Sequence, residues 1–187
     1  DTIRVELNQR KAQGYDYVAV SPGNYGLDYM KKVYHYDLNR SVKCSNFIGQ
    51  TIDMAVELGF QRMLLTGHIG KLIKVAGGIM NTHSREGDCR MELLTAFAVK
   101  IGVELPVAQQ ILTCVTTEEA VRILDSCGKR VPVMEAAMER IFYYRIPITY
   151  QLHSYDWQKL GRTLLSNRQS ADQIRADPFR QVSNVRR

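Results

Sequence analysis

The chain has 187 residues, which is enough for one sizeable domain with a buried core. Hydrophobic residues make up 45% and charged residues 24% of the sequence, as expected for a soluble globular protein. The net charge of +6 is concentrated near the C-terminus, because residues 158–187 hold seven basic and two acidic residues and residues 1–157 are almost neutral. This distribution gives little support to nucleic-acid binding by the folded body. No apolar run approaches the length of a membrane span.

The spacing of the cysteines gives an expectation about the cellular compartment, and the first residue gives one about the length of the protein. The four cysteines lie far apart and have no CxxC spacing, which indicates reduced thiols in a cytoplasmic protein more than a disulfide framework or a zinc site. The chain starts at Asp1, without an initiator methionine or a signal-peptide pattern. We therefore expect it to be a fragment of a longer protein.

The first elements alternate between helix and strand. The apolar spacing predicts a helix over residues 2–13 that stops at Gly14. Residues 15–20 are apolar and β-prone, and they lead into a glycine-rich turn over residues 21–26. In that turn glycine permits positive φ angles.

A second helix and a second strand follow. Ser45 is expected to cap a helix over residues 46–58, with Gly59 as its C-terminal stop. This helix is apolar on more than one face, so we expect it to be well buried. Residues 62–66 are predicted to form a short apolar strand.

The remaining pattern is mainly helical. A long helix is expected from Ser84 or Asp88 to about residue 101, and Gly102 ends it. Three more helices are predicted over residues 107–114, 117–126 and 133–144. A β-prone piece over residues 148–152 follows, and the basic segment 158–187 is expected to be loosely ordered or helical. The predicted domains are thus a folded body over residues 1–157 and this basic C-terminal segment.

This order of elements predicts an α/β fold, a layered domain with a mostly parallel sheet flanked by helices. In such sheets the loops that follow the strands emerge at one edge, where ligands bind. The loops over residues 21–26 and 67–70 both follow predicted strands. We therefore expect them to form two walls of one pocket.

Two familiar kinds of site fit the stretch over residues 64–84 poorly. A phosphate loop needs GxxxxGK[ST], but Leu65 precedes Gly70 at the required spacing and Leu72 follows Lys71. GxGxxG is absent as well, so the dinucleotide fingerprint fails. A zinc or iron site remains an alternative, and its ligands would be His68, His83 and Asp88.

An anion pocket fits the same stretch better. The N-terminus of a helix starting near Gly70 attracts negative charge, and Lys71 and Lys74 share one side of that helix. Arg85 and Arg90 lie just beyond. Four glycines within residues 67–78 would weaken a helix, and we interpret them as positions where backbone comes close to a ligand.

Four motifs in this order resemble those of one enzyme family: Pro22-Gly23-Asn24-Tyr25-Gly26, Cys44-Ser45-Asn46-Phe47-Ile48-Gly49, Gly67-His68-Ile69-Gly70-Lys71-Leu72 and Asn81-Thr82-His83-Ser84. They are similar to the CbiD family, the cobalt-precorrin-5B C-methyltransferases of anaerobic cobalamin biosynthesis. The resemblance covers roughly residues 1–105 and corresponds to the C-terminal part of a family member. It implies a two-domain protein whose N-terminal domain is not in this chain.

The resemblance implies methylation of carbon 1 of a cobalt-containing tetrapyrrole, with S-adenosylmethionine as the cofactor and no resident metal. It also suggests roles for residues of this chain. The cofactor-binding residues would be Gly23, Asn24, Gly26, Ser45 and Asn46. The residues holding substrate carboxylates would be Lys71, Lys74, Arg85 and Arg90. A histidine could accept a proton or approach the cobalt, and Asp88 could orient it, so the catalytic candidates are His68, His83 and Asp88.

Two other functions remain open from the sequence. One is a non-enzymatic module that binds acidic partners or nucleic acid through the basic segment 158–187. The other is a metal-dependent hydrolase that uses the two histidines and the aspartate named above. The leading prediction is an enzyme whose partners are the tetrapyrrole and the missing N-terminal domain. A homo-oligomer is possible, and neither a membrane nor nucleic acid is expected as a partner.

Overall fold

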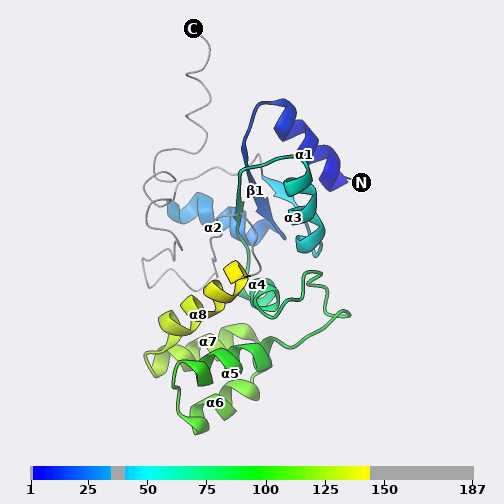
Figure 1. Cartoon of the computed structure of the whole chain (residues 1–187). Coiled ribbons are helices and arrows are strands. Elements are labelled where there is room, and N and C mark those ends of the chain that lie inside the picture. Colours follow the sequence, from blue (N-terminus) through cyan, green and yellow to red (C-terminus); the bar gives the residue numbers. More distant parts are fainter. Residues whose placement is uncertain (1, 35–40, 144–187) are drawn as a thin grey trace.

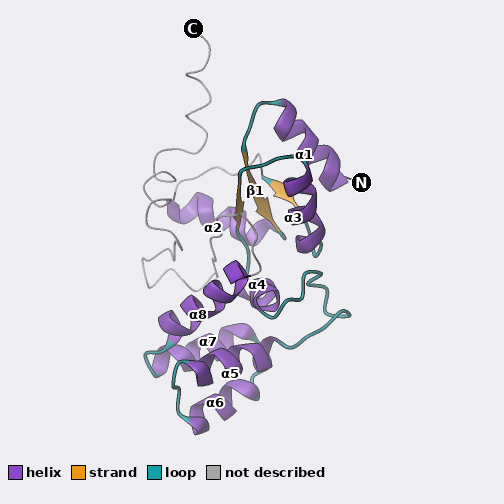
Figure 2. Ribbon diagram, in the orientation of Figure 1, coloured by secondary structure: helices purple, strands orange, loops and turns teal. Residues whose placement is uncertain are grey.

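The computed structural model of the chain describes residues 2–34 and 41–143 (Figure 1). Helices and strands alternate in its first part, and helices alone form the rest (Figure 2). In chain order the elements are α1 Thr2–Ala12, β1 Tyr17–Ser21, α2 Asn24–Tyr34, β2 Val42–Lys43, α3 Ile48–Glu57, β3 Arg62–Leu65, α4 Ile69–Ala76, α5 Arg90–Lys100, α6 Leu105–Leu112, α7 Thr117–Ser126 and α8 Arg130–Tyr143. The expected strand over residues 148–152 and the basic segment 158–187 lie outside the described residues.

The three strands form one parallel sheet in the order β2-β1-β3. Val20 of β1 pairs with Val42 on one side and with Leu65 on the other. Figure 1 shows α1 and α3 together on one side of the strands and α2 on the other. Because helices cover the sheet, the central strand reads as a continuous apolar run. The predicted α/β fold with a parallel sheet flanked by helices is confirmed.

Helix α4 joins the sheet to the remaining helices. It contacts α5 and α8, and α5 in turn packs on α6, α7 and α8. Its apolar residues Leu72, Ile73, Val75 and Ala76 are buried, and they belong to one core that continues through Leu94, Ile111 and Leu124 of the later helices. The sheet and the helical part are therefore one packed unit, and α4 sits between them.

Several predicted helix ends are confirmed. Gly14, Gly59 and Gly102 all have positive φ angles at the ends of helices, where a side chain would be strained. The helix predicted over residues 117–126 also has these bounds in the structure, where Thr116 caps α7 by accepting a hydrogen bond from the Glu119 backbone N–H.

Other boundaries were predicted wrongly. Ser45 does not cap α3: Phe47 is at the N-cap without a side-chain hydrogen bond, and Ser45 has a φ of 53° in the preceding turn. The long helix begins at Arg90, later than either predicted start. The predicted turn over residues 21–26 is shorter than expected, because α2 already begins at Asn24. Helix α2 and strand β2 were not predicted from the sequence.

None of the helices within the described part of the chain is long and apolar enough to traverse a bilayer.

Candidate functional site: a cationic cavity at the edge of the sheet

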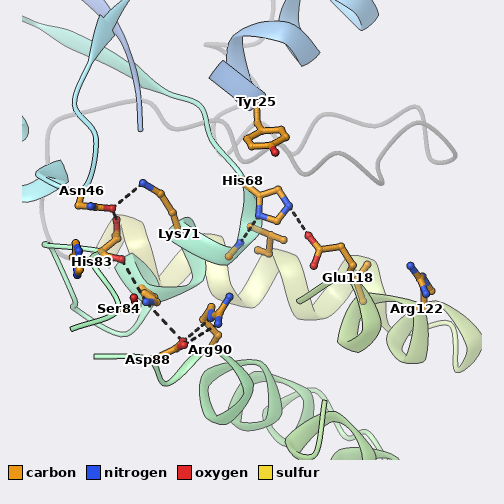
Figure 3. Close-up of a pocket in the computed structure, with 15 residues that line it drawn as sticks. Tyr25, Asn46, His68, Lys71, His83, Ser84, Asp88, Arg90, Glu118 and Arg122 are labelled. Carbon is orange, nitrogen blue, oxygen red and sulfur yellow. Dashed lines mark hydrogen bonds and ion pairs between the residues drawn. The ribbon is translucent and has the colours of Figure 1, made fainter. Parts of the chain in front are cut away.

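A cavity of about 820 Å³ opens beside the N-terminus of α4 and extends towards α7 (Figure 3). Its volume falls within the range of roughly 300–1,000 Å³ that is usual for ligand pockets. The lining residues come from both the sheet edge and the later helices: Tyr25, Asn46, His68, Ile69, Gly70, Lys71, Lys74, Thr82, His83, Ser84, Asp88, Arg90, Glu118, Val121 and Arg122.

Residues that follow β1 and β3 meet at this cavity, although on the β1 side the contributing residue lies in the first turn of α2 and not in a loop. Tyr25 follows β1 and His68 follows β3, and their ring centroids are 5.8 Å apart. In the strand order β2-β1-β3, the chain crosses from one side of β1 to the other, so the topology switches between β1 and β3. Ligands of open α/β sheets bind outside the carboxyl ends of the strands at such a switch point.

His68 is held at both ring nitrogens. Its Nδ1 accepts a hydrogen bond of 3.1 Å from the Gly70 backbone N–H, so the side chain caps α4. Its Nε2 lies 2.7 Å from Oε1 of Glu118, near the start of α7. A neutral imidazole whose Nδ1 accepts must carry its proton on Nε2. His68 therefore donates to Glu118 and connects the starts of α4 and α7.

Lys71 is tied to the loop that follows β2. Its Nζ donates to Oδ1 of Asn46 at 2.8 Å, and the Ser45 carbonyl is 3.4 Å away. Thr82 Oγ1 donates to the same Asn46 oxygen at 3.4 Å. Partial burial lowers the pKa of Lys71, and the neighbouring Lys74 lowers it further.

Lys74 lies deeper than Lys71. Its side chain is only 4% exposed, and Nζ is 3.7 Å from Oδ1 of Asp88 and 3.4 Å from the Thr82 carbonyl oxygen. Arg90 holds the same carboxylate with two hydrogen bonds, of 2.6 Å from Nε and 2.8 Å from Nη2. The Arg90 hydrogen bonds are the main reason that the pKa of Asp88 is below its usual value.

The cavity brings together most of the predicted catalytic and substrate-binding residues. Those that line it are His68, His83, Asp88, Lys71, Lys74 and Arg90, together with Asn46 from the predicted cofactor set. The predicted residues that do not line it are Gly23, Asn24, Gly26, Ser45 and Arg85. The Asp88 carboxylate contacts Arg90 and Lys74, and the carboxylate beside His68 is that of Glu118.

The glycines have a different explanation from the predicted one. A Cβ at Gly77 would lie 2.6 Å from Cδ1 of Leu93, and one at Gly67 would lie 3.1 Å from Cδ of Pro22. These positions allow segments of the chain itself to pack closely. Gly78 has a φ of +86° just after α4. Of the four glycines in the stretch, only Gly70 lines the cavity.

Among the lining residues that were not predicted as site residues, three carry an aromatic ring or a charge: Tyr25, Glu118 and Arg122. Glu118 lies in the first turn of α7, where a negative charge is favourable. Its second role depends on how α7 packs near α4, which no local pattern reports.

The alternative metal site is not supported. Within residues 2–34 and 41–143, no group of three His, Cys, Asp or Glu residues is placed to hold a metal ion. Nδ1 of His83 accepts a hydrogen bond from the Arg85 backbone N–H in an exposed turn. The basic segment 158–187 falls outside the described residues, so a role for it in binding acidic partners stays a prediction.

The fold and the cavity define a class: an α/β protein with a cationic ligand pocket at the carboxyl edge of a small parallel sheet. Comparison with known families identifies the particular family within this class. Residues 81–145 match the family model described as CbiD, C-terminal domain. The chain belongs to the CbiD family.

Curated relatives share the same name, cobalt-precorrin-5B C(1)-methyltransferase. The protein from Ruminiclostridium cellulolyticum is 42% identical over 144 residues, which are 77% of this chain and 38% of that protein. The one from Clostridioides difficile is 40% identical over 69% of this chain and 32% of its own length. The one from Klebsiella pneumoniae is 36% identical over 86% of this chain and 45% of its own length. The chain thus spans less than half of these relatives, and no solved structure matches it.

Proposed function

We propose that this chain takes part in the methylation of carbon 1 of cobalt-precorrin-5B in cobalamin biosynthesis, with S-adenosylmethionine as the methyl donor. The relatives' shared name supports the reaction. Because the chain spans less than half of each relative, we further propose that the rest of a full-length protein completes the active site.

The observation that carries the proposal is the charge of the cavity. Four basic side chains line it, Lys71, Lys74, Arg90 and Arg122, against two carboxylates. Both carboxylates already have partners, since Asp88 is held by Arg90 and Glu118 by His68. The cavity therefore has cationic capacity left for a ligand, and a precorrin carries acetate and propionate carboxylates around its ring.

The residues proposed to bind the methyl donor fit that role only in part. A Cβ at Gly26 would lie 2.7 Å from Oγ1 of Thr66, so the close approach at this glycine is made by protein. Asn46 lines the cavity, but its carboxamide oxygen already accepts from Lys71. We therefore assign this part of the chain to the methyl acceptor.

Bound S-adenosylmethionine would supply a methyl group activated by its positive sulfur. The chain's own contribution would be to hold and orient the ring, and such alignment can lower a barrier by on the order of 7–11 kcal/mol in favourable cases. His68 and His83 both accept a backbone hydrogen bond at Nδ1. A neutral ring therefore carries its proton on Nε2, and each histidine serves as a donor rather than as a base.

Binding of cobalt-precorrin-5B to the full chain, followed by its absorption spectrum, tests the proposal. Lys71→Glu places a negative charge on the cavity wall and is expected to weaken binding at least tenfold, since repulsion replaces attraction. Lys32→Glu is the matched control, because it makes the same charge change at an exposed site on α2. Equal weakening by both variants, or no binding by the unaltered chain, would contradict an acceptor site in this cavity.

A further inference from the structure

The positive charge of Lys74 is deeply buried, but it is only weakly compensated by neighbouring oxygen atoms. Its side chain is 4% exposed, and its contacts with protein oxygens are long, at 3.4 Å to the Thr82 carbonyl and 3.7 Å to Asp88. Good charge-assisted hydrogen bonds are about 2.7–2.9 Å long. A buried ammonium is costly unless it is well paired. The protein thus keeps at the cavity wall a charge that its own side chains satisfy only loosely.

The carboxylate near Lys74 is that of Asp88, and it is bound more tightly by Arg90. Both oxygens of Asp88 are engaged by the guanidinium, at 2.6 and 2.8 Å. Figure 3 shows Asp88 and Arg90 at the lower side of the cavity with their charged ends together. The two cations and this one carboxylate leave a net positive charge at this point.

The three groups differ in how freely they can move. Lys74 is buried within α4, and Arg90 is the first residue of α5, so both cations are anchored on helices. Asp88 lies before α5 in the connecting segment, and its side chain is 40% exposed. A rotation of Asp88 into solvent would release both cations without moving a helix.

We propose that Lys74 and Arg90 form a subsite for one carboxylate of the ligand, and that Asp88 fills this subsite until the ligand displaces it. The inference rests on the proposed function for the view that the ligand is a polycarboxylate. The subsite selects for charge, because a neutral amide or ester at the same place gives too little to replace the two charge-assisted bonds to Arg90. Asp88 is therefore a competitor of the ligand.

Uroporphyrin, a tetrapyrrole with eight carboxylates, is the probe, and its binding to the full chain is measured by fluorescence. Asp88→Asn keeps the shape of the side chain but removes the competing charge, and we expect it to tighten binding by roughly fivefold, the scale of one exposed ion pair. Asp53→Asn removes the same charge from an exposed position on α3, outside this cavity, and is expected to change affinity little.

The gain in affinity of Asp88→Asn must also depend on the guanidinium of Arg90. Arg90→Gln alone is expected to weaken binding, and Asp88→Asn made on top of it is expected to give no gain. Unchanged or weaker binding in Asp88→Asn would overturn the proposal, as would an equal gain in Asp53→Asn. Circular dichroism and thermal melting identify a variant that fails to fold, and Asp88→Ser then repeats the test. Because uroporphyrin binding needs no methyl transfer, this outcome is separate from whether the chain supports methylation.

Discussion

Replacing Lys74 by methionine is expected to make the protein more stable while it loses ligand binding. The change removes a buried ammonium that has only long contacts and puts an unbranched apolar side chain in its place. Replacing buried ionic groups by apolar residues of similar size is often neutral or stabilising by about 1–4 kcal/mol.

The sign depends on what Lys74 leaves behind. Removing one partner of a buried pair is usually destabilising, because the other charge is stranded. Here Asp88 keeps both hydrogen bonds to Arg90 and is 40% exposed, so no charge is stranded. The Thr82 carbonyl loses a 3.4 Å contact, which costs up to about 1 kcal/mol. The expected net gain is therefore roughly 1–2 kcal/mol.

Urea unfolding of the full chain, followed by circular dichroism, measures the free energy of unfolding of Lys74→Met. Lys100→Met is the control, because that lysine is exposed in the last turn of α5 and should shift stability by no more than about 0.5 kcal/mol. Binding of uroporphyrin to Lys74→Met is expected to fall at least tenfold. A loss of stability above about 1 kcal/mol would show that Lys74 is a structural residue and would refute the reasoning.

Other predictions concern packing, thiol chemistry and the link between α4 and α7. Gly26→Ala is expected to lower the free energy of unfolding by roughly 1–3 kcal/mol, because the new Cβ meets Thr66 backbone 2.8 Å away; Gly23→Ala, where a Cβ meets nothing within 4 Å, is the control. Burial raises the pKa of the Cys44 thiol from 9.0 to about 12, so at pH 8 iodoacetamide should label it about a thousandfold more slowly than a free thiol. Above pH 9 the thiol ionises in the unfolded chain but stays protonated in the folded one. Cys44 should therefore contribute stability that is complete below pH 9 and declines from there towards pH 12. A Cys44→Ala variant with the same alkaline decline would contradict this. His68→Ala removes a helix cap and a hydrogen bond, and it should lower the free energy of unfolding in urea by about 1–2 kcal/mol. Glu118→Gln keeps an acceptor oxygen and should lower it by less than about 1 kcal/mol. Equal losses in the two variants would show that the charge of Glu118, rather than the cap, matters.

The sequence predicted the elements whose signals are local. The strand ending at Leu65 has a continuous apolar run, and Gly59 stops the helix before it with a positive φ. Helix α2 was missed because its sequence begins Asn-Tyr-Gly, which is typical of a turn. Gly26 is helical because α2 packs directly on Thr66, a tertiary contact that local propensity does not report. Strand β2 has only two residues, too few for any periodicity.

The site residues show the same contrast between local sequence signals and tertiary contacts. Parallel strands place the loops after β1 and β3 at one edge, so sequence order alone located the wall with His68 and Lys71. The opposite wall required knowledge of which distant helix packs there. Arg122 and Glu118 lie on α7, and the first turn of that helix reads in sequence only as an ordinary acidic N-terminus.

The family match divides this cavity between two parts of the chain. The C-terminal domain of the family covers residues 81–145, which supply Asp88, Arg90 and Glu118, whereas Lys74 and His68 precede it. The His68–Glu118 hydrogen bond and the Lys74–Asp88 contact both cross this boundary. A segment limited to residues 81–145 would keep Arg90 and Asp88 paired with each other and would lack the buried cation. The cationic cavity therefore depends on the sheet edge and the helical part together, and α4 is the element that joins them.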